Sequence, residues 1–131
     1  MSDSRLERIL YVDDEPDIQE VVGMALELIA GAQIRSCGSG SEALAIAASF
    51  RPEIILLDVM MPGMDGPATL SALKRDPTTS SIPIVFVTAK ANTRELQHFL
   101  DLGAVDVIAK PIDPMKLGSQ VERIWMASRG R

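Results

Sequence analysis

The chain has 131 residues, of which 47% are hydrophobic and 24% charged, and its formal net charge is −5. This composition predicts one ordered globular domain and excludes a disordered chain. The acidic balance argues against direct nucleic-acid binding, and the single cysteine, Cys37, excludes an internal disulfide.

Neither a signal peptide nor a membrane span is apparent in the sequence. The amino terminus is polar and charged, and no apolar run approaches the roughly 20 residues that a membrane helix needs. We therefore expect a soluble, cytoplasmic protein without membrane contact. Its single domain should span residues 1–131, with a core at about 7–127 and short polar termini.

The chain opens with a strand pattern followed by a helix pattern. The apolar run Ile9–Val12 predicts a strand. Pro16 then stands near the start of a helix, and Gly31 is placed to cap its end. The apolar residues that recur at helical spacing, and so define its buried face, are Ile18, Val21, Val22, Ala25, Leu28 and Ile29.

The next pair of elements leads into the most apolar part of the sequence. Residues 33–37 mix apolar and polar types, which is typical of an edge strand with one wet face. An Ala-rich helix is predicted over Ser41–Phe50, and Pro52 breaks it. Residues 54–57 are all apolar and predict a strand that is buried on both faces.

The second half of the chain continues the alternation. A loop rich in proline and glycine precedes a helix that reaches about Lys74, and residues 84–87 form another fully apolar strand. The helix that follows is lined by Leu96, Phe99 and Leu100 and ends at Gly103.

A fifth strand, with Val105, Val107 and Ile108, precedes the last helix. That helix opens with Asp113 as N-cap and Pro114 as its first residue. Its buried face is expected to contain Leu117, Val121, Ile124 and Trp125.

Alternating strands and helices predict an α/β fold with a parallel sheet covered by helices on both faces. The runs that begin at Ile9, Ile54 and Ile84 are the most apolar and should be central, with residues 33–37 at an edge. This pattern matches the flavodoxin-like strand order 2-1-3-4-5, in which chemistry takes place at the carboxyl ends of the strands.

Polar side chains stand directly after four of these strands. Asp13 and Asp14 follow the first strand, Asp58 the third, Thr88 the fourth and Lys110 closely follows the fifth. Because the carboxyl ends of parallel strands meet at one edge, we expect these five residues to lie close together.

The charges at this edge predict a bound cation and an anionic substrate. Lys110 offsets one of the three carboxylates, Asp13, Asp14 and Asp58, and leaves two negative charges for a divalent ion. Carboxylate and water ligands suit Mg²⁺. With Asp58 as nucleophile, the Lys110 ammonium and the Thr88 hydroxyl could each bind an oxygen of a phosphoryl group.

The ordered motifs resemble the receiver domain of bacterial two-component response regulators of the stand-alone, chemotaxis-regulator type. The resemblance covers roughly residues 7–127. Its motifs are Val12-Asp13-Asp14-Glu15, Leu57 to Gly66, Val87-Thr88-Ala89, Gly103-Ala104 and Lys110-Pro111. A flavodoxin-like fold and a phosphorylation switch are what this resemblance implies.

The resemblance also implies a role for each motif. Asp58 would accept a phosphoryl group from a phosphohistidine of a sensor histidine kinase or a histidine phosphotransfer protein. Asp13, Asp14, Asp58 and the backbone carbonyl of Met60 would hold Mg²⁺. The protein would then be a switch rather than an enzyme, with intrinsic autophosphorylation and autodephosphorylation activity.

Thr88 and Lys110 would bind the phosphoryl oxygens, and the Lys110-Pro111 peptide would be cis. One residue departs from the family pattern: Val107 stands three positions before the lysine, where receivers usually carry an aromatic ring. Because valine has no ring to swing, we expect the signal to pass through Thr88 and residues 89–92 into the following helix.

The resemblance implies output through contact or onward phosphorelay, since we expect no output domain after residue 127. The usual effector face in this family comprises the fourth helix, fifth strand and fifth helix. That face could also form a weak homodimer, with a monomer as the alternative. The sole histidine, His98, lies mid-helix away from the predicted site and should face solvent or a partner.

Three other functions are less well supported by the sequence. A phosphatase with an aspartyl-phosphate intermediate would need an acid two residues after Asp58, where Met60 stands. A flavodoxin-like cofactor binder would need a Gly/Ser/Thr-rich loop in place of the acidic residues 13–16. The intact set of acids argues against a degenerate receiver that serves only as a docking surface.

Overall fold

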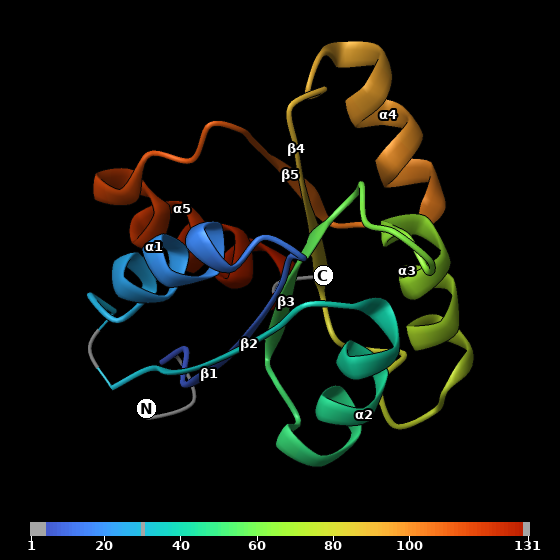
Figure 1. Ribbon diagram of the computed structural model, residues 1–131, viewed down its shortest axis with the longest axis horizontal. Coiled ribbons are helices and arrows are strands. Elements are labelled where there is room, and N and C mark those ends of the chain that lie inside the picture. Colours follow the sequence, from blue (N-terminus) through green and yellow to red (C-terminus); the bar gives the residue numbers. More distant parts are fainter. Residues whose placement is uncertain (1–4, 30, 130–131) are drawn as a thin grey trace.

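The computed structural model describes residues 5–29 and 31–129 and shows one sheet between two layers of helices (Figure 1). The outermost residues of the predicted polar termini lie outside the described part. In chain order the elements are β1 (Arg8–Val12), α1 (Pro16–Leu26), β2 (Gln33–Cys37), α2 (Gly40–Phe50), β3 (Ile54–Asp58), α3 (Gly66–Arg75), β4 (Ile84–Thr88), α4 (Thr93–Leu102), β5 (Asp106–Ala109) and α5 (Pro114–Arg129).

The predicted sheet topology is confirmed. The five strands are ordered β2-β1-β3-β4-β5, and every neighbouring pair is parallel. β3 and β4 are buried along their whole length, whereas β2 is largely exposed, as its mixed composition predicts. Uninterrupted apolar runs can be covered on both faces only in the middle of the sheet.

Successive strand residues contact opposite helix layers because side chains alternate along a strand. In β1, Ile9 and Tyr11 pack in the core beneath α1 and α5, while Leu10 and Val12 pack beneath α2, α3 and α4. Figure 1 shows these two layers on opposite sides of the sheet. Burying each large apolar side chain contributes about 1.5–3 kcal/mol, so both faces stabilise the fold.

Local hydrogen bonds explain where several helices begin and end. The side chains of Ser39, Asp65 and Asn92 accept a hydrogen bond from the third backbone N–H of α2, α3 and α4, respectively. The Asp113 side chain accepts a hydrogen bond from the N–H of Met115, the second residue of α5. Gly103 ends α4 as predicted, with a φ of 120° that side chains disfavour.

The predicted carboxyl end of the first helix is wrong. α1 ends at Leu26, several residues before Gly31, because the backbone tightens into turns in which Leu28 N–H bonds to Ala25 O and Ile29 N–H to Leu26 O. Tightening rotates later side chains out of helical phase. Leu28 is therefore 72% exposed, although Ile29 is buried as predicted. Val21, which lies within the regular helix, is 46% exposed and does not belong to the buried face either.

The architecture brings the carboxyl ends of β1, β3, β4 and β5 to one edge of the sheet, where the predicted site residues follow. None of the helices in the described residues combines the length and the apolar character that crossing a membrane requires.

Candidate functional site

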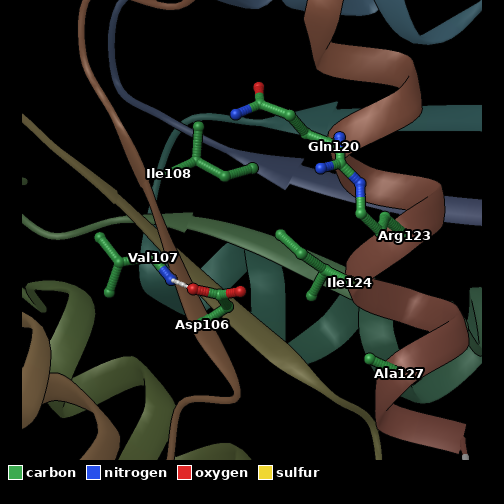
Figure 2. Close-up of a pocket in the computed structure, with 7 residues that line it drawn as sticks. All are labelled: Asp106, Val107, Ile108, Gln120, Arg123, Ile124 and Ala127. Carbon is green, nitrogen blue, oxygen red and sulfur yellow. Dashed lines mark hydrogen bonds between the residues drawn. The ribbon is translucent and has the colours of Figure 1, made fainter.

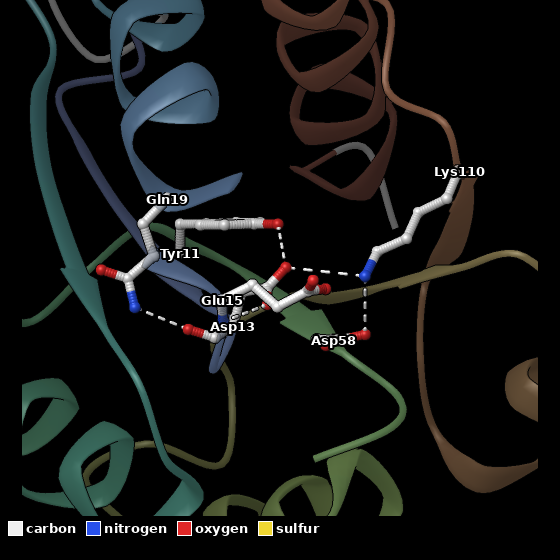
Figure 3. A network of polar contacts seen from close by, with 6 residues as sticks. All are labelled: Tyr11, Asp13, Glu15, Gln19, Asp58 and Lys110. Carbon is white, nitrogen blue, oxygen red and sulfur yellow. Dashed lines mark hydrogen bonds and ion pairs between the residues drawn. The ribbon is translucent and has the colours of Figure 1, made fainter. Parts of the chain in front are cut away.

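Asp13 is a fully buried carboxylate that the protein holds at both oxygens. Its Oδ2 accepts a hydrogen bond of 2.7 Å from the Tyr11 hydroxyl, and its Oδ1 accepts one of 2.9 Å from the Glu15 N–H. Gln19 Nε2 donates to the Asp13 backbone carbonyl at 2.6 Å (Figure 3). Because all three contacts come from β1 or the start of α1, the strand-to-helix junction fixes the orientation of this carboxylate.

Lys110 connects the two buried acids of the site. Its Nζ donates to Asp58 Oδ1 at 3.2 Å and lies 3.6 Å from Asp13 Oδ2 (Figure 3). The backbone N–H of Lys110 bonds to Thr88 O, which fixes the start of the loop after β5 beside β4. The Lys110-Pro111 peptide is cis, as the sequence resemblance implied.

The surroundings of Asp58 disfavour its charged form relative to that of an exposed aspartate. Burial raises the pKa of Asp58, the Asp13 charge raises it further, and Lys110 with the Met60 backbone partly offsets both. Burial alone lowers the pKa of Lys110, but Asp13, Asp58 and Glu15 together raise it above its usual value. Lys110 therefore keeps its positive charge, and the pocket around it still has an excess of negative charge.

The acids fit a hard divalent cation. Carboxylate oxygens of Asp13, Asp14 and Asp58 all lie within 4.8 Å of one another. Asp13 and Asp58 are buried, whereas Asp14 is exposed and leaves the site open to solvent. Oxygen donors with room for several waters are what Mg²⁺ prefers.

Thr88 lies at the end of β4, one residue beyond the register partner of Asp58 on the neighbouring strand. The side chain is buried, and its Oγ1 accepts a hydrogen bond of 3.0 Å from the Lys90 N–H. The hydroxyl hydrogen points to no acceptor among the described residues, so it is free to donate to a ligand.

Other predicted residues lie around this centre. Met60 follows β3 in the loop beside Asp58, and its side chain is 74% exposed; the role of its carbonyl stays a prediction. Val107 is half-buried on β5, and His98 is exposed on α4 as expected. Burial raises the pKa of Cys37 to about 11, which keeps this thiol protonated as expected of a small buried residue.

Sequence reasoning missed two residues of the polar network, Tyr11 and Gln19. A strand places residues two apart on the same face, so a tyrosine two positions before Asp13 was a usable signal. Gln19 lies one turn inside α1, whereas Asp13 lies before the helix begins. Helical spacing alone therefore does not predict a contact between them.

The sequence matches a known family over most of its length. Residues 9–122 match the model of the response regulator receiver domain. The DNA-binding response regulator MtrA of Mycolicibacterium smegmatis is 38% identical over 119 residues, which cover 91% of this chain and 50% of that protein. A probable cyclic di-GMP phosphodiesterase of Vibrio cholerae is 38% identical over 113 residues, 86% of this chain and 25% of that protein.

Solved structures give the same result at the level of the fold. The chemotaxis protein CheY4 of Vibrio cholerae superposes with a TM-score of 0.83 at 29% identity, over 91% of this chain and 98% of that one. The chain thus spans nearly all of a chemotaxis protein but about half or less of the curated relatives named above.

Proposed function

Because this chain belongs to the response regulator receiver family, we propose that it accepts a phosphoryl group on Asp58 and passes the signal on as a change of shape. The observation that carries the proposal is the contact of the Asp58 carboxylate with the Lys110 ammonium, inside a cluster of three acids. This arrangement joins a nucleophile, a cation site and a fixed positive charge.

The chemistry is the transfer of a phosphoryl group from nitrogen to oxygen. A carboxylate oxygen of Asp58 forms a bond to phosphorus while the bond from phosphorus to the donor histidine breaks, and the freed imidazole takes up a proton. Bound Mg²⁺ would neutralise charge on the phosphoryl oxygens. Lys110 exchanges its contact with Asp58 for one with a phosphoryl oxygen, and the Thr88 hydroxyl donates to another.

The donor and the output partner are other proteins. We propose a sensor histidine kinase or a histidine phosphotransfer protein as donor, because the single histidine of the sequence, His98, is exposed on α4 with its ring tilted against Phe99 and is not part of the site. Intrinsic autophosphorylation from small phosphodonors and autodephosphorylation belong to the same proposal.

The proposed effector face comprises α4, β5 and α5. Between β5 and α5 lies a hollow of about 340 Å³ (Figure 2). Its lining is mostly apolar, from Val107, Ile108, Ile124 and Ala127, and Asp106, Gln120 and Arg123 add polar and charged groups. Asp106 on β5 and Arg123 on α5 offer opposite charges on the two sides of this hollow, and Val107 lies next to Asp106 on β5. A partner with paired charges of its own would complement this face.

The test is the intact mass of the protein after incubation with Mg²⁺ and acetyl phosphate or phosphoramidate, with Asp58→Asn as control. We expect a phosphate-sized, acid-stable and alkali-labile gain in the native protein alone. If the native protein binds Mg²⁺ but gains no mass from these donors or from phosphohistidine proteins, the proposal is wrong.

A further inference from the structure

Tyr11 is the only tyrosine in the chain, and its hydroxyl contacts an acid of the site. The residue is fully buried on the face of β1 that packs beneath α1 and α5. A strand directs residues i and i+2 to the same side, so the side chains of Tyr11 and Asp13 lie next to each other on one face. The hydroxyl donates to Asp13 Oδ2 at 2.7 Å, a short bond of the charge-assisted type (Figure 3).

The contact leaves the hydroxyl little freedom. A buried tyrosine hydroxyl needs a partner, but any backbone carbonyl would satisfy that need. Here the acceptor is a carboxylate of the functional site, and it receives no other side-chain hydrogen bond among the described residues.

Tyr11 and Lys110 share one oxygen of Asp13. The Tyr11 hydroxyl donates to Asp13 Oδ2 at 2.7 Å, and the Lys110 ammonium lies farther from the same oxygen, at 3.6 Å. The ammonium is closer to Asp58 Oδ1, at 3.2 Å. The tyrosine therefore supplies part of the compensation that the buried Asp13 charge requires. Lys110 is left closer to Asp58, where the proposed reaction needs its charge.

We propose that Tyr11 is a positioning residue that holds the Asp13 carboxylate in the orientation required to bind Mg²⁺ together with Asp14 and Asp58. This inference rests on the proposed function. Partners that hydrogen-bond to metal ligands fix ligand orientation, and removing one typically lowers metal affinity by about 10–100-fold. Tyr11→Phe keeps the buried ring and removes only the hydroxyl.

The experiment measures Mg²⁺ affinity by calorimetry in the wild type and in Tyr11→Phe. The matched control is Thr79→Val, because Thr79 is also buried and donates its hydroxyl to Leu73 O at 2.7 Å, in the loop after α3. We expect Tyr11→Phe to bind Mg²⁺ about 10-fold more weakly and Thr79→Val to bind as the wild type does.

A second measurement follows the tyrosine directly. Near-ultraviolet absorbance of the wild type during the Mg²⁺ titration should show a shift of the tyrosine band, with the midpoint found by calorimetry. The difference between wild-type spectra with and without Mg²⁺ isolates the change, since the single tryptophan, Trp125, lies on α5 outside the site. Because the wild-type band itself is observed, this measurement remains decisive if the variant proves unstable.

The outcomes separate this inference from the proposed function. Mg²⁺ affinity in Tyr11→Phe within twofold of the wild type, or a tyrosine band that does not respond to Mg²⁺, would overturn the role of Tyr11 alone. A wild-type protein that binds no Mg²⁺ would overturn both the role of Tyr11 and the metal site of the proposed function.

Discussion

Lys110 and Asp58 form an ion pair of 3.2 Å that joins the carboxyl ends of β5 and β3. The pair is largely shielded from water, with 23% of the Lys110 side chain and 5% of the Asp58 side chain exposed. In the structure, the Lys110 charge offsets the negative charges of Asp13 and Asp58. The same ammonium is the group that would bind an arriving phosphoryl oxygen, so one residue serves both the resting and the modified protein.

Replacing Lys110 with Gln should destabilise the fold by about 1–3 kcal/mol, since buried carboxylates lose their positive partner. Urea unfolding without metal measures the loss. Adding Mg²⁺ should restore more stability to the variant than to the wild type, because the cation then provides the only compensating charge. Lys116→Gln on the exposed start of α5 is the matched control and should change stability by less than about 0.5 kcal/mol. Equal effects of the two variants would contradict this account.

Asp58→Asn should make the metal-free protein more stable at neutral pH, because burial and the Asp13 charge disfavour the Asp58 carboxylate in the folded state. The pKa of Asp58 is raised in the folded state, above all by burial. The folded state therefore binds more protons than the unfolded state between the two pKa values, and stability falls as pH rises through that window. Well below the pKa of about 3.9 of an unfolded aspartate, the carboxyl is protonated in both states, and the advantage of Asn should vanish.

Chemical denaturation of both proteins across this pH range, in the presence of a chelator, checks the prediction. An Asp58→Asn variant that is less stable than the wild type at neutral pH would show that the Lys110 contact outweighs burial and the Asp13 charge.

Asp14→Asn should remove metal binding without disturbing the fold. Asp14 is exposed, so its replacement should change metal-free stability by less than about 0.5 kcal/mol. At a Mg²⁺ concentration 100 times the dissociation constant, the wild type should gain about 2.7 kcal/mol, and most of this gain should be lost in the variant. Asp17→Asn, an exposed acid in the first turn of α1 outside the cluster, should keep the gain.

Two glycines should respond in opposite ways to alanine. At Gly66 a Cβ would lie 2.6 Å from the Asp58 carbonyl oxygen and 2.8 Å from Val59 Cα, so Gly66→Ala must displace the backbone that carries Asp58. We expect a loss of about 1–3 kcal/mol and slower phosphorylation. At Gly23, inside α1, a Cβ would have no neighbouring atom within 4 Å. Gly23→Ala should therefore stabilise the folded protein by about 0.5–1 kcal/mol. Thermal unfolding and the phosphorylation assay test both.

The fold was predictable because local patterns and tertiary burial agree. The all-apolar run Ile54–Leu57 could only be a central strand, and residues 33–37 could only be an edge. The end of α1 was not predictable from periodicity, since Leu28 continues the apolar pattern after the backbone has already tightened. Gly31 does take a positive φ of 81°, but in the turn beyond the helix.

The candidate site was predictable at the level of which residues meet. Asp13, Asp14, Asp58 and Lys110 follow strands that the topology brings to one edge, and the structure places them together. The contacts that orient them were not predictable. Whether Tyr11 reaches Asp13 depends on side-chain rotamers inside a packed core, which a sequence pattern does not determine.

Thr88→Val should separate phosphorylation from the change of shape. The Thr88 hydroxyl accepts the Lys90 N–H at 3.0 Å, and two residues later Asn92 caps α4 by accepting from the Glu95 N–H. Binding of the hydroxyl to a phosphoryl oxygen would pull on this loop and move the start of α4. Valine keeps the β-branched shape but offers neither donor nor acceptor, so phosphorylation should persist while the displacement of α4 is lost.

Amide NMR spectra with Mg²⁺ and acetyl phosphate provide the measurement. In the wild type and in the control Thr88→Ser, the amides of residues 89–92 and of α4 should shift on phosphorylation. In Thr88→Val they should stay near their resting positions, although intact mass shows the modification. Since Val107 has no ring to transmit the change, equal shifts of α4 in Thr88→Val would mean that the signal leaves the site by another route, through the cation and the loop that follows β3.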